Sequence, residues 1–277
     1  MQKRVVWGAF FCAVLLTVLV FGGEKPVRIL IDQTRLVPYS ETAYYFSMHD
    51  LNWYGISDFV NLLRSRGYLV ESLDKWPFTP ETFLRVDVLI IPESEFGYRD
   101  SEIEAIKEFV AQGGGLFVGS RMWYGETQTF WGTKRLVEAF GSTFFANGRI
   151  FDKKNCYFWT YPRSWIPIVS AVPGHPITEG VKSVYYQGTY VGVPEGATVL
   201  LQSSPDSWFD YFTGGHFANR KDKDEPNGPF PVMIAFTYGL GRVVIAGDAS
   251  FLMNDWMPEL DAKELAQNIV EWLAKKL

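Results

Sequence analysis

Polar side chains of this 277-residue chain stand repeatedly where an apolar run ends. Loops that leave the carboxyl ends of parallel strands border the open crevice of an α/β sheet, so chemistry is expected there. The side chains at these positions are Asp32, Gln33, Glu93, Ser120, Arg121, Asp248, Asn254 and Asp255. Carboxylates, amides, a hydroxyl and a guanidinium suit a pocket for a small polar ligand. The alternative is that Asp, Asn and Ser at such points cap helices and close turns.

A hydrolase is the catalytic alternative, acting through the strand-tip carboxylates or through Ser120. Serine catalysis needs a Gly-x-Ser-x-Gly turn and a nearby His, and the turn Gly119-Ser120-Arg121 lacks the second glycine. A metal site would combine His49 and Asp50 with Asp32 and Asp248, yet no two His share a ligand spacing. We therefore predict no catalytic residue, no metal and no cofactor.

Alternating strands and helices must position these residues. Apolar runs predict strands at 26–32, 68–70, 86–91 and 116–118, and helical spacing predicts a helix from Trp53 to Gly67. Ser101 and Glu104 predict a capping box for a second helix. Short strands are expected at 183–186 and 198–201, a hairpin at 231–246, and a last helix with Leu265 and Ile269 inside. This alternation predicts an α/β fold with three layers, in which helices cover both faces of a mostly parallel sheet, mixed at one edge.

Six segments together resemble the class I glutamine amidotransferase-like superfold: Ile29–Thr34, Leu62–Tyr68, Val88–Glu93, Phe109–Gly115, His175–Val181 and Gly247–Phe251. The match is with its non-amidotransferase branch, which includes the domain of gliding-motility and intraflagellar-transport proteins. The trehalose-utilisation-type domain and the trimerisation domain of some β-galactosidases belong to the same branch. The resemblance covers residues 27–275 and implies a flavodoxin-like sheet.

The true amidotransferases carry a nucleophilic Cys on the sharp turn that follows the strand matching Leu116–Val118. Here that turn reads Gly119-Ser120-Arg121, and no His lies beyond His216 to serve as its partner. Cys156 has no glycine pair beside it that would allow such a turn. A thiolate nucleophile needs an adjacent base, so glutamine hydrolysis is not expected.

Residues 1–23 form a separate segment, in which Lys3 and Arg4 precede the apolar run Val5–Phe21. This pattern predicts a signal peptide, or an N-terminal membrane anchor if it is not cleaved. The expected location is periplasmic or extracellular, with residues 24–277 as one domain. The formal net charge of −5 argues against nucleic acid as a partner. Cys156 is the one cysteine outside the leader, so no intramolecular disulfide is expected.

The segment 143–230 is rich in aromatic residues and is expected to be a long insertion. Its rings include Trp159, Tyr161, Trp165, Tyr185, Tyr186, Tyr190, Trp208, Tyr211 and Phe212. Flat rings stack on sugar faces, but they also fill cores or subunit contacts. We interpret the chain as an exported, non-catalytic domain that binds a small polar ligand, such as a carbohydrate, or an envelope transport protein. The alternatives are the hydrolase and an oligomer-forming structural module.

Overall fold

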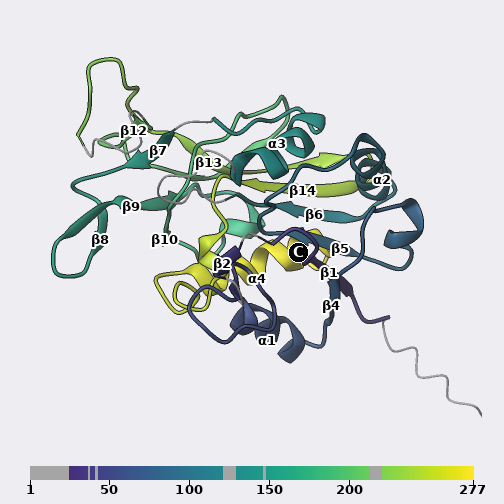
Figure 1. The fold of residues 1–277 in the computed structure, drawn as a ribbon. Helices are drawn as coiled ribbons and strands as arrows, with labels where there is room; N and C mark the ends of the chain where they lie inside the picture. The colour runs from purple at the N-terminus through teal and green to yellow at the C-terminus, as the bar shows by residue number, and fades with distance from the viewer. Residues whose placement is uncertain (1–24, 37, 41–42, 121–128, 146–147, 213–219) are drawn as a thin grey trace, which may run out of the picture.

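The computed structural model describes residues 25–36, 38–40, 43–120, 129–145, 148–212 and 220–277. Within these ranges ten strands form one mixed sheet (Figure 1). Across the sheet the strands are β10 (Ser183–Tyr185), β9 (Pro162–Ala171), β11 (Thr198–Gln202), β13 (Pro231–Tyr238), β14 (Gly241–Ala246), β6 (Gly115–Val118), β5 (Val88–Ile91), β1 (Arg28–Asp32) and β4 (Leu69–Leu73). The remaining strand, β8 (Cys156–Phe158), pairs with β9.

The strands from β4 to β14 run parallel and build one half of the sheet. Helix α1 (Ser57–Ser65) joins β1 to β4, helix α2 (Asp100–Ala111) joins β5 to β6, and helix α3 (Thr129–Ala139) follows β6. The chain passes from β4 across β1 to β5, so the direction of winding reverses between β1 and β5. This is the flavodoxin-like order, and ligands of such folds lie at the carboxyl ends beside the reversal.

Helices cover both faces of the parallel half, as the sequence predicts. Ile29 and Ile31 of β1 belong to the core cluster beneath α1 and helix α4 (Ala262–Leu273). Leu30, which points to the opposite face, belongs to the cluster beneath α2 and α3. Both faces of β1, β5, β6 and β14 are buried, whereas the edge strand β4 exposes Leu69 and Glu71. This burial explains why the four inner strands appear in the sequence as short continuous apolar runs.

The antiparallel half is larger than the sequence suggests. The predicted hairpin of β13 and β14 is confirmed, with Ala235 opposite Val244. Segment 143–230 also supplies β8, β9, β10 and β11 to the sheet. Strand β9 is missed by the sequence pattern because Pro162 and Pro167 indicate a break in a strand. Pairing along β9 nevertheless carries the sheet beyond β11.

Short elements complete the described structure. Strand β7 (Gly148–Phe151) pairs with β12 (Trp208–Tyr211), and β2 (Pro38–Ser40) pairs with β3 (Ala43–Tyr44). Single 3₁₀ turns are η1 (Pro80–Phe83), η2 (Pro176–Thr178) and η3 (Ser250–Leu252). No helix in the described ranges is long and apolar enough to cross a membrane, and the predicted leader lies outside those ranges.

The predicted capping box of α2 is wrong. The helix begins at Asp100, and the carboxylate of Glu102, rather than that of Glu104, accepts the Arg99 amide at 3.0 Å. Glu104 lies on the helix surface and pairs with Lys107 at 2.9 Å. The helix therefore starts two residues earlier than expected, and Glu102, at its third position, is buried.

Candidate functional site

Four of the predicted residues meet at one edge of the sheet. Asp32 ends β1, Glu93 follows β5, Ser120 follows β6 and Asp248 follows β14, and these four strands are neighbours. All four side chains are buried. Arg121 lies outside the described residues. The sheet therefore gathers the polar strand tips as expected, but it places them beneath the surface.

The carboxylate of Asp32 is surrounded by hydrogen-bond donors. Its Oδ1 accepts the Thr34 amide at 2.8 Å and the Thr34 hydroxyl at 2.6 Å, and its Oδ2 accepts the Tyr98 hydroxyl at 2.6 Å. Burial raises the pKa of Asp32, an effect that the hydrogen bonds from Thr34 and Tyr98 only partly offset. Burial, and then the adjacent Asp32, also raises the pKa of Tyr98 well above its usual value. Asp32 thus anchors a closed network.

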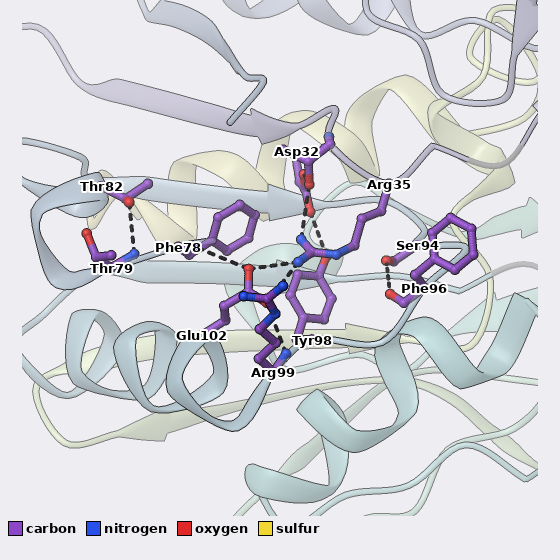
Figure 2. Close-up of polar contacts among 11 residues, drawn as sticks. Asp32, Arg35, Phe78, Thr79, Thr82, Ser94, Phe96, Tyr98, Arg99 and Glu102 are labelled. Atoms are coloured by element: carbon purple, nitrogen blue, oxygen red, sulfur yellow. Dashed lines mark hydrogen bonds and ion pairs between the residues drawn. The ribbon is translucent and has the colours of Figure 1, made fainter. Parts of the chain in front are cut away.

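An ion pair that the sequence analysis missed seals this network. Nη2 of Arg35 donates to both carboxylate oxygens of Glu102, at 2.7 and 2.8 Å, and both residues are buried. In Figure 2 the guanidinium lies over the Tyr98 ring, 4.5 Å from its centroid. The Phe78 ring lies 5.1 Å from the same guanidinium. Arg35 therefore ties the loop after β1 to the start of α2.

The Glu102 carboxylate accepts hydrogen bonds from two backbone amides as well as from the Arg35 guanidinium. The backbone amides of Phe78 and Arg99 each donate to it at 3.0 Å. Burial alone would raise the pKa of Glu102, but the Arg99 amide, Arg35 and the Phe78 amide together hold it below its ordinary value. The charged form is thus the one that the folded protein stabilises. An acid at the third position of a helix was the available sequence signal, and it lacked the Ser or Thr that usually accompanies it.

Asp248 holds a turn from the opposite half of the sheet against the strand tip. Its Oδ2 accepts the Gln187 amide at 2.7 Å, and its Oδ1 accepts the amide and hydroxyl of Ser250 at 2.9 and 2.6 Å. A Cβ at Gly188 would lie 2.7 Å from the Cβ of Asp248. The 187–189 turn therefore covers this carboxylate closely.

Gln33 and Asn254 each fasten a loop. Gln33 accepts the Met48 amide at 2.9 Å and donates to the Phe46 carbonyl at 3.2 Å. Asn254 accepts the Asp58 amide at the start of α1 at 3.0 Å, and it donates to the Asn52 carbonyl at 2.7 Å. Their amides thus bond to backbone groups in the manner of turn and cap residues.

Ser120 follows β6, at the turn where the resemblance to the amidotransferases would place a nucleophilic Cys. Its side chain is fully buried, and its hydroxyl has no hydrogen-bond partner among the described residues. Cys156 instead opens β8, opposite Pro167, on the other half of the sheet. Burial, and then the nearby Asp152, raises the pKa of the Cys156 thiol, which disfavours the nucleophilic thiolate.

Histidines and other possible metal ligands form no cluster in the described part of the chain. Nδ1 of His175 accepts the Ile177 amide at 3.1 Å, and its ring packs on Trp272. His216 lies outside the described residues. Where side chains are described, no three of His, Cys, Asp and Glu are placed together as metal ligands.

An open pocket lies between the β8–β9 hairpin and the segment that follows η3. We call it the aromatic pocket, and its lining residues are Tyr157, Trp159, Arg163, Ile166, Asp255, Trp256 and Glu259. Its volume is about 500 Å³. Among the predicted site residues that the structure describes, Asp255 is the one that lines it.

The rings of the aromatic pocket are held by one another. Tyr157 and Trp256 meet edge to face at 5.5 Å between centroids, and Tyr185 packs against both. Trp159 is 66% exposed, and its ring lies 5.4 Å from the guanidinium of Arg163. The pocket thus presents flat apolar faces beside one basic and two acidic side chains.

Sequence comparison identifies the family. The profile of a domain of unknown function, DUF4350, matches residues 49–270. The chain belongs to the DUF4350 family. No curated protein matches this DUF4350 chain in sequence.

Solved structures confirm the fold. The mmIFT52 N-terminal domain superposes with a TM-score of 0.66 at 15% identity, over 89% of this chain and 96% of its own. A ThuA-like protein from Parabacteroides merdae ATCC 43184 gives a TM-score of 0.52 at 13% identity, over 91% of both chains. Gan42B, a GH42 β-galactosidase from G. stearothermophilus, gives only 0.47 at 17% identity, over 91% of this chain and 30% of its own. The predicted likeness to the intraflagellar-transport and trehalose-utilisation-type domains is therefore confirmed for the fold.

Proposed function

We propose that this DUF4350 chain is an exported, non-catalytic domain that binds a carbohydrate in the aromatic pocket. The single observation that carries the proposal is the aromatic pocket itself. It joins the exposed Trp159 ring and the half-buried Tyr157 and Trp256 rings to charged side chains in one hollow. Asp32, Glu93, Ser120 and Asp248, by contrast, lie buried.

The chemistry of the pocket suits a neutral saccharide. The faces of Tyr157, Trp159 and Trp256 offer apolar surfaces for the C–H faces of a sugar ring. Asp255 and Glu259 accept hydrogen bonds from hydroxyl groups, and Arg163 donates to them. The two carboxylates outnumber the one guanidinium, so an acidic sugar or a phosphate is a poorer fit.

The burial of Asp32, Asp248 and Ser120 argues against hydrolysis at the strand-tip edge. A hydrolase would need a carboxylate or hydroxyl that faces a substrate there. Asp32 and Asp248 instead accept hydrogen bonds from neighbouring protein groups, and Ser120 is fully buried. Export rests on the sequence of residues 1–23, with their basic start and apolar run.

The proposal is tested by thermal unfolding with maltose, cellobiose, lactose and N,N′-diacetylchitobiose. A saccharide at tenfold its Kd adds about 1.4 kcal/mol of stability, which corresponds to a rise in Tm of about 3–6 °C for a domain of this size. Trp159→Ala and Asp255→Asn change exposed pocket residues and should abolish the shift while the protein stays folded.

Phe96→Ala is the matched control, because this ring is 62% exposed but lies in the loop after β5 at the strand-tip edge. It should leave the saccharide shift intact. The proposal fails if none of the four saccharides raises the Tm, or if Trp159→Ala keeps the shift while Phe96→Ala removes it.

A second candidate is an assembly module, or a docking site for an envelope transport protein. It is favoured by the exposed rings of Phe158, Trp159 and Tyr161 at the tip of the β8–β9 hairpin. Exposed apolar patches often mark protein contacts. Sedimentation would then show a dimer or larger species that Phe158→Ser converts to a monomer, without any saccharide.

A further inference from the structure

A second surface stands at the opposite end of the parallel strands, where they begin. We call it the basal face and define it by Lys25, Leu84, Arg85, Leu240, Lys275 and Leu277. Leu84 and Leu240 are 67% and 75% exposed, and Leu277 is exposed as well. Isolated exposed leucines are ordinary in proteins. Three exposed leucines on one face, beside several cations, instead indicate a contact surface.

Contacts between the loops show that these residues share one face. Leu84, Arg85 and Lys275 line a single cavity of about 380 Å³. Nζ of Lys275 donates to the Leu240 carbonyl at 3.0 Å. Nη1 of Arg242, at the start of β14, donates to the carbonyl of Leu277 at 2.9 Å. The ends of η1, β13 and α4 therefore meet in one surface.

The start of β1 lies at the same face. The amide of Arg28, its first residue, donates at 2.8 Å to Asp87, which lines the same cavity as Arg85 and Lys275. Lys25 precedes this strand by three residues. The chain therefore enters the domain through the basal face.

The basal face carries cations although the chain as a whole has a negative net charge. The full sequence has a formal net charge of −5, yet Lys25, Arg85 and Lys275 form no salt bridge within the part of the chain that the structure describes. Of the acids nearby, Glu71 pairs with Arg28, Glu271 pairs with Arg66, and Asp87 accepts the Arg28 amide. Glu81 and Glu108 line the adjoining pocket beside Leu84. Lys25, Arg85 and Lys275 therefore keep positive charges without an ion pair among the described residues.

We propose that the basal face lies against an anionic phospholipid surface, with the leader retained as an anchor. The inference rests on the export part of the proposed function. The seven residues Gly22–Arg28 span at most about 25 Å even when extended. A retained apolar run Val5–Phe21 would therefore hold this face, and no other end of the sheet, near the bilayer. Exposed leucines enter the interface while Lys and Arg meet anionic headgroups.

Site-specific fluorescence tests the proposal on the full chain in vesicles of phosphatidylcholine with phosphatidylglycerol. A bimane label on Leu240→Cys, in a Cys12→Ser/Cys156→Ser background, reports contact with nitroxide-labelled lipid by quenching. Leu51→Cys is the matched control, because Leu51 is 82% exposed in the loop before α1, which Asn254 ties to the carboxyl-end edge. We expect strong quenching at position 240 and none at position 51.

Charge reversal separates lipid contact from mere anchoring. Arg85→Glu together with Lys275→Glu should remove the quenching at position 240 while the chain remains vesicle-bound. Raising the salt concentration should weaken the quenching in the same way. The same samples can be tested for the saccharide shift, which does not depend on this face.

Three results would overturn the proposal. One is a full chain that stays in solution in the presence of the vesicles. Another is a vesicle-bound chain without quenching at position 240, which would leave the basal face to a protein partner. The third is quenching that the charge-reversed variant retains in full. A saccharide shift that persists in any of these cases shows that the pocket proposal stands separately.

Discussion

Replacing Glu102 by Gln should destabilise the fold far more than its position on a helix suggests. The substitution conserves volume, but it removes the charge that Arg35 meets and leaves a buried guanidinium without its counter-ion. The new amide nitrogen also cannot accept from the backbone amide of Phe78 or Arg99. Breaking a buried ion pair in this way costs about 3–5 kcal/mol. For a domain of this size that corresponds to a fall in Tm of roughly 6–20 °C.

The matched control is Glu104→Gln, two residues along the same helix. Glu104 is exposed and pairs only with the partly exposed Lys107, so its loss should change the free energy of unfolding by less than about 0.5 kcal/mol. Urea unfolding of both variants gives the comparison. The double variant Arg35→Met/Glu102→Gln should lose less free energy of unfolding than the single variants Arg35→Met and Glu102→Gln lose together. Equal stability of the two Gln variants, or additive losses at Arg35 and Glu102, would refute the account of the network.

The loss of folding stability at acid pH should also report the charge of Glu102. The folded pKa of Glu102 lies below its unfolded value of about 4.3. Its contribution is therefore fully present above that pH and is lost as the pH falls through the folded pKa. Asp32 acts in the opposite sense, because its raised pKa favours proton uptake on folding. Glu102→Gln should flatten the acid-side loss of stability in urea titrations, and an unchanged slope would contradict the assignment.

Three further predictions follow from close contacts. Gly132→Ala should lower the Tm even though Ala favours helices, because a Cβ there would lie 1.8 Å from the Ser94 carbonyl; a rise in Tm would contradict the packing of α3. Asp248→Asn should cost about 1–3 kcal/mol in urea unfolding, since one of the two accepting oxygens becomes an NH2 group that can accept neither the Gln187 amide nor the Ser250 donors, and an unchanged midpoint would contradict this role of the carboxylate. Cys156 should react with iodoacetamide more slowly at pH 8 than a free cysteine, because its raised pKa leaves less thiolate, whereas a faster reaction would indicate an activating base.

The gathering of polar strand tips was predictable, whereas their burial was not. Asp32 and Asp248 end apolar runs, and the parallel order of the strands brings such ends to one edge. Asp32 is enclosed beside the ion pair of Arg35 and Glu102, which are 67 residues apart and meet only after β1 and α2 have packed, and Asp248 is covered by the 187–189 turn. No local sequence pattern encodes such a pairing.

The aromatic pocket was predictable only in its parts. Asp255 was expected at a site, and Trp159 was among the rings noted for stacking on sugars. Their meeting requires β9 to pair within the sheet, and Pro162 and Pro167 conceal this strand in the sequence. Strand pairing in the folded protein therefore outweighs the tendency of these two prolines to interrupt a strand.

Hydrogen–deuterium exchange with the saccharide that raises the Tm most is the most direct test of where the ligand binds. Binding in the aromatic pocket predicts added protection in residues 156–166 and 255–259, with residues 32–36 and 93–99 unchanged. Protection confined to 32–36, 93–99 and 247–252 would place the ligand at the strand tips and contradict the account.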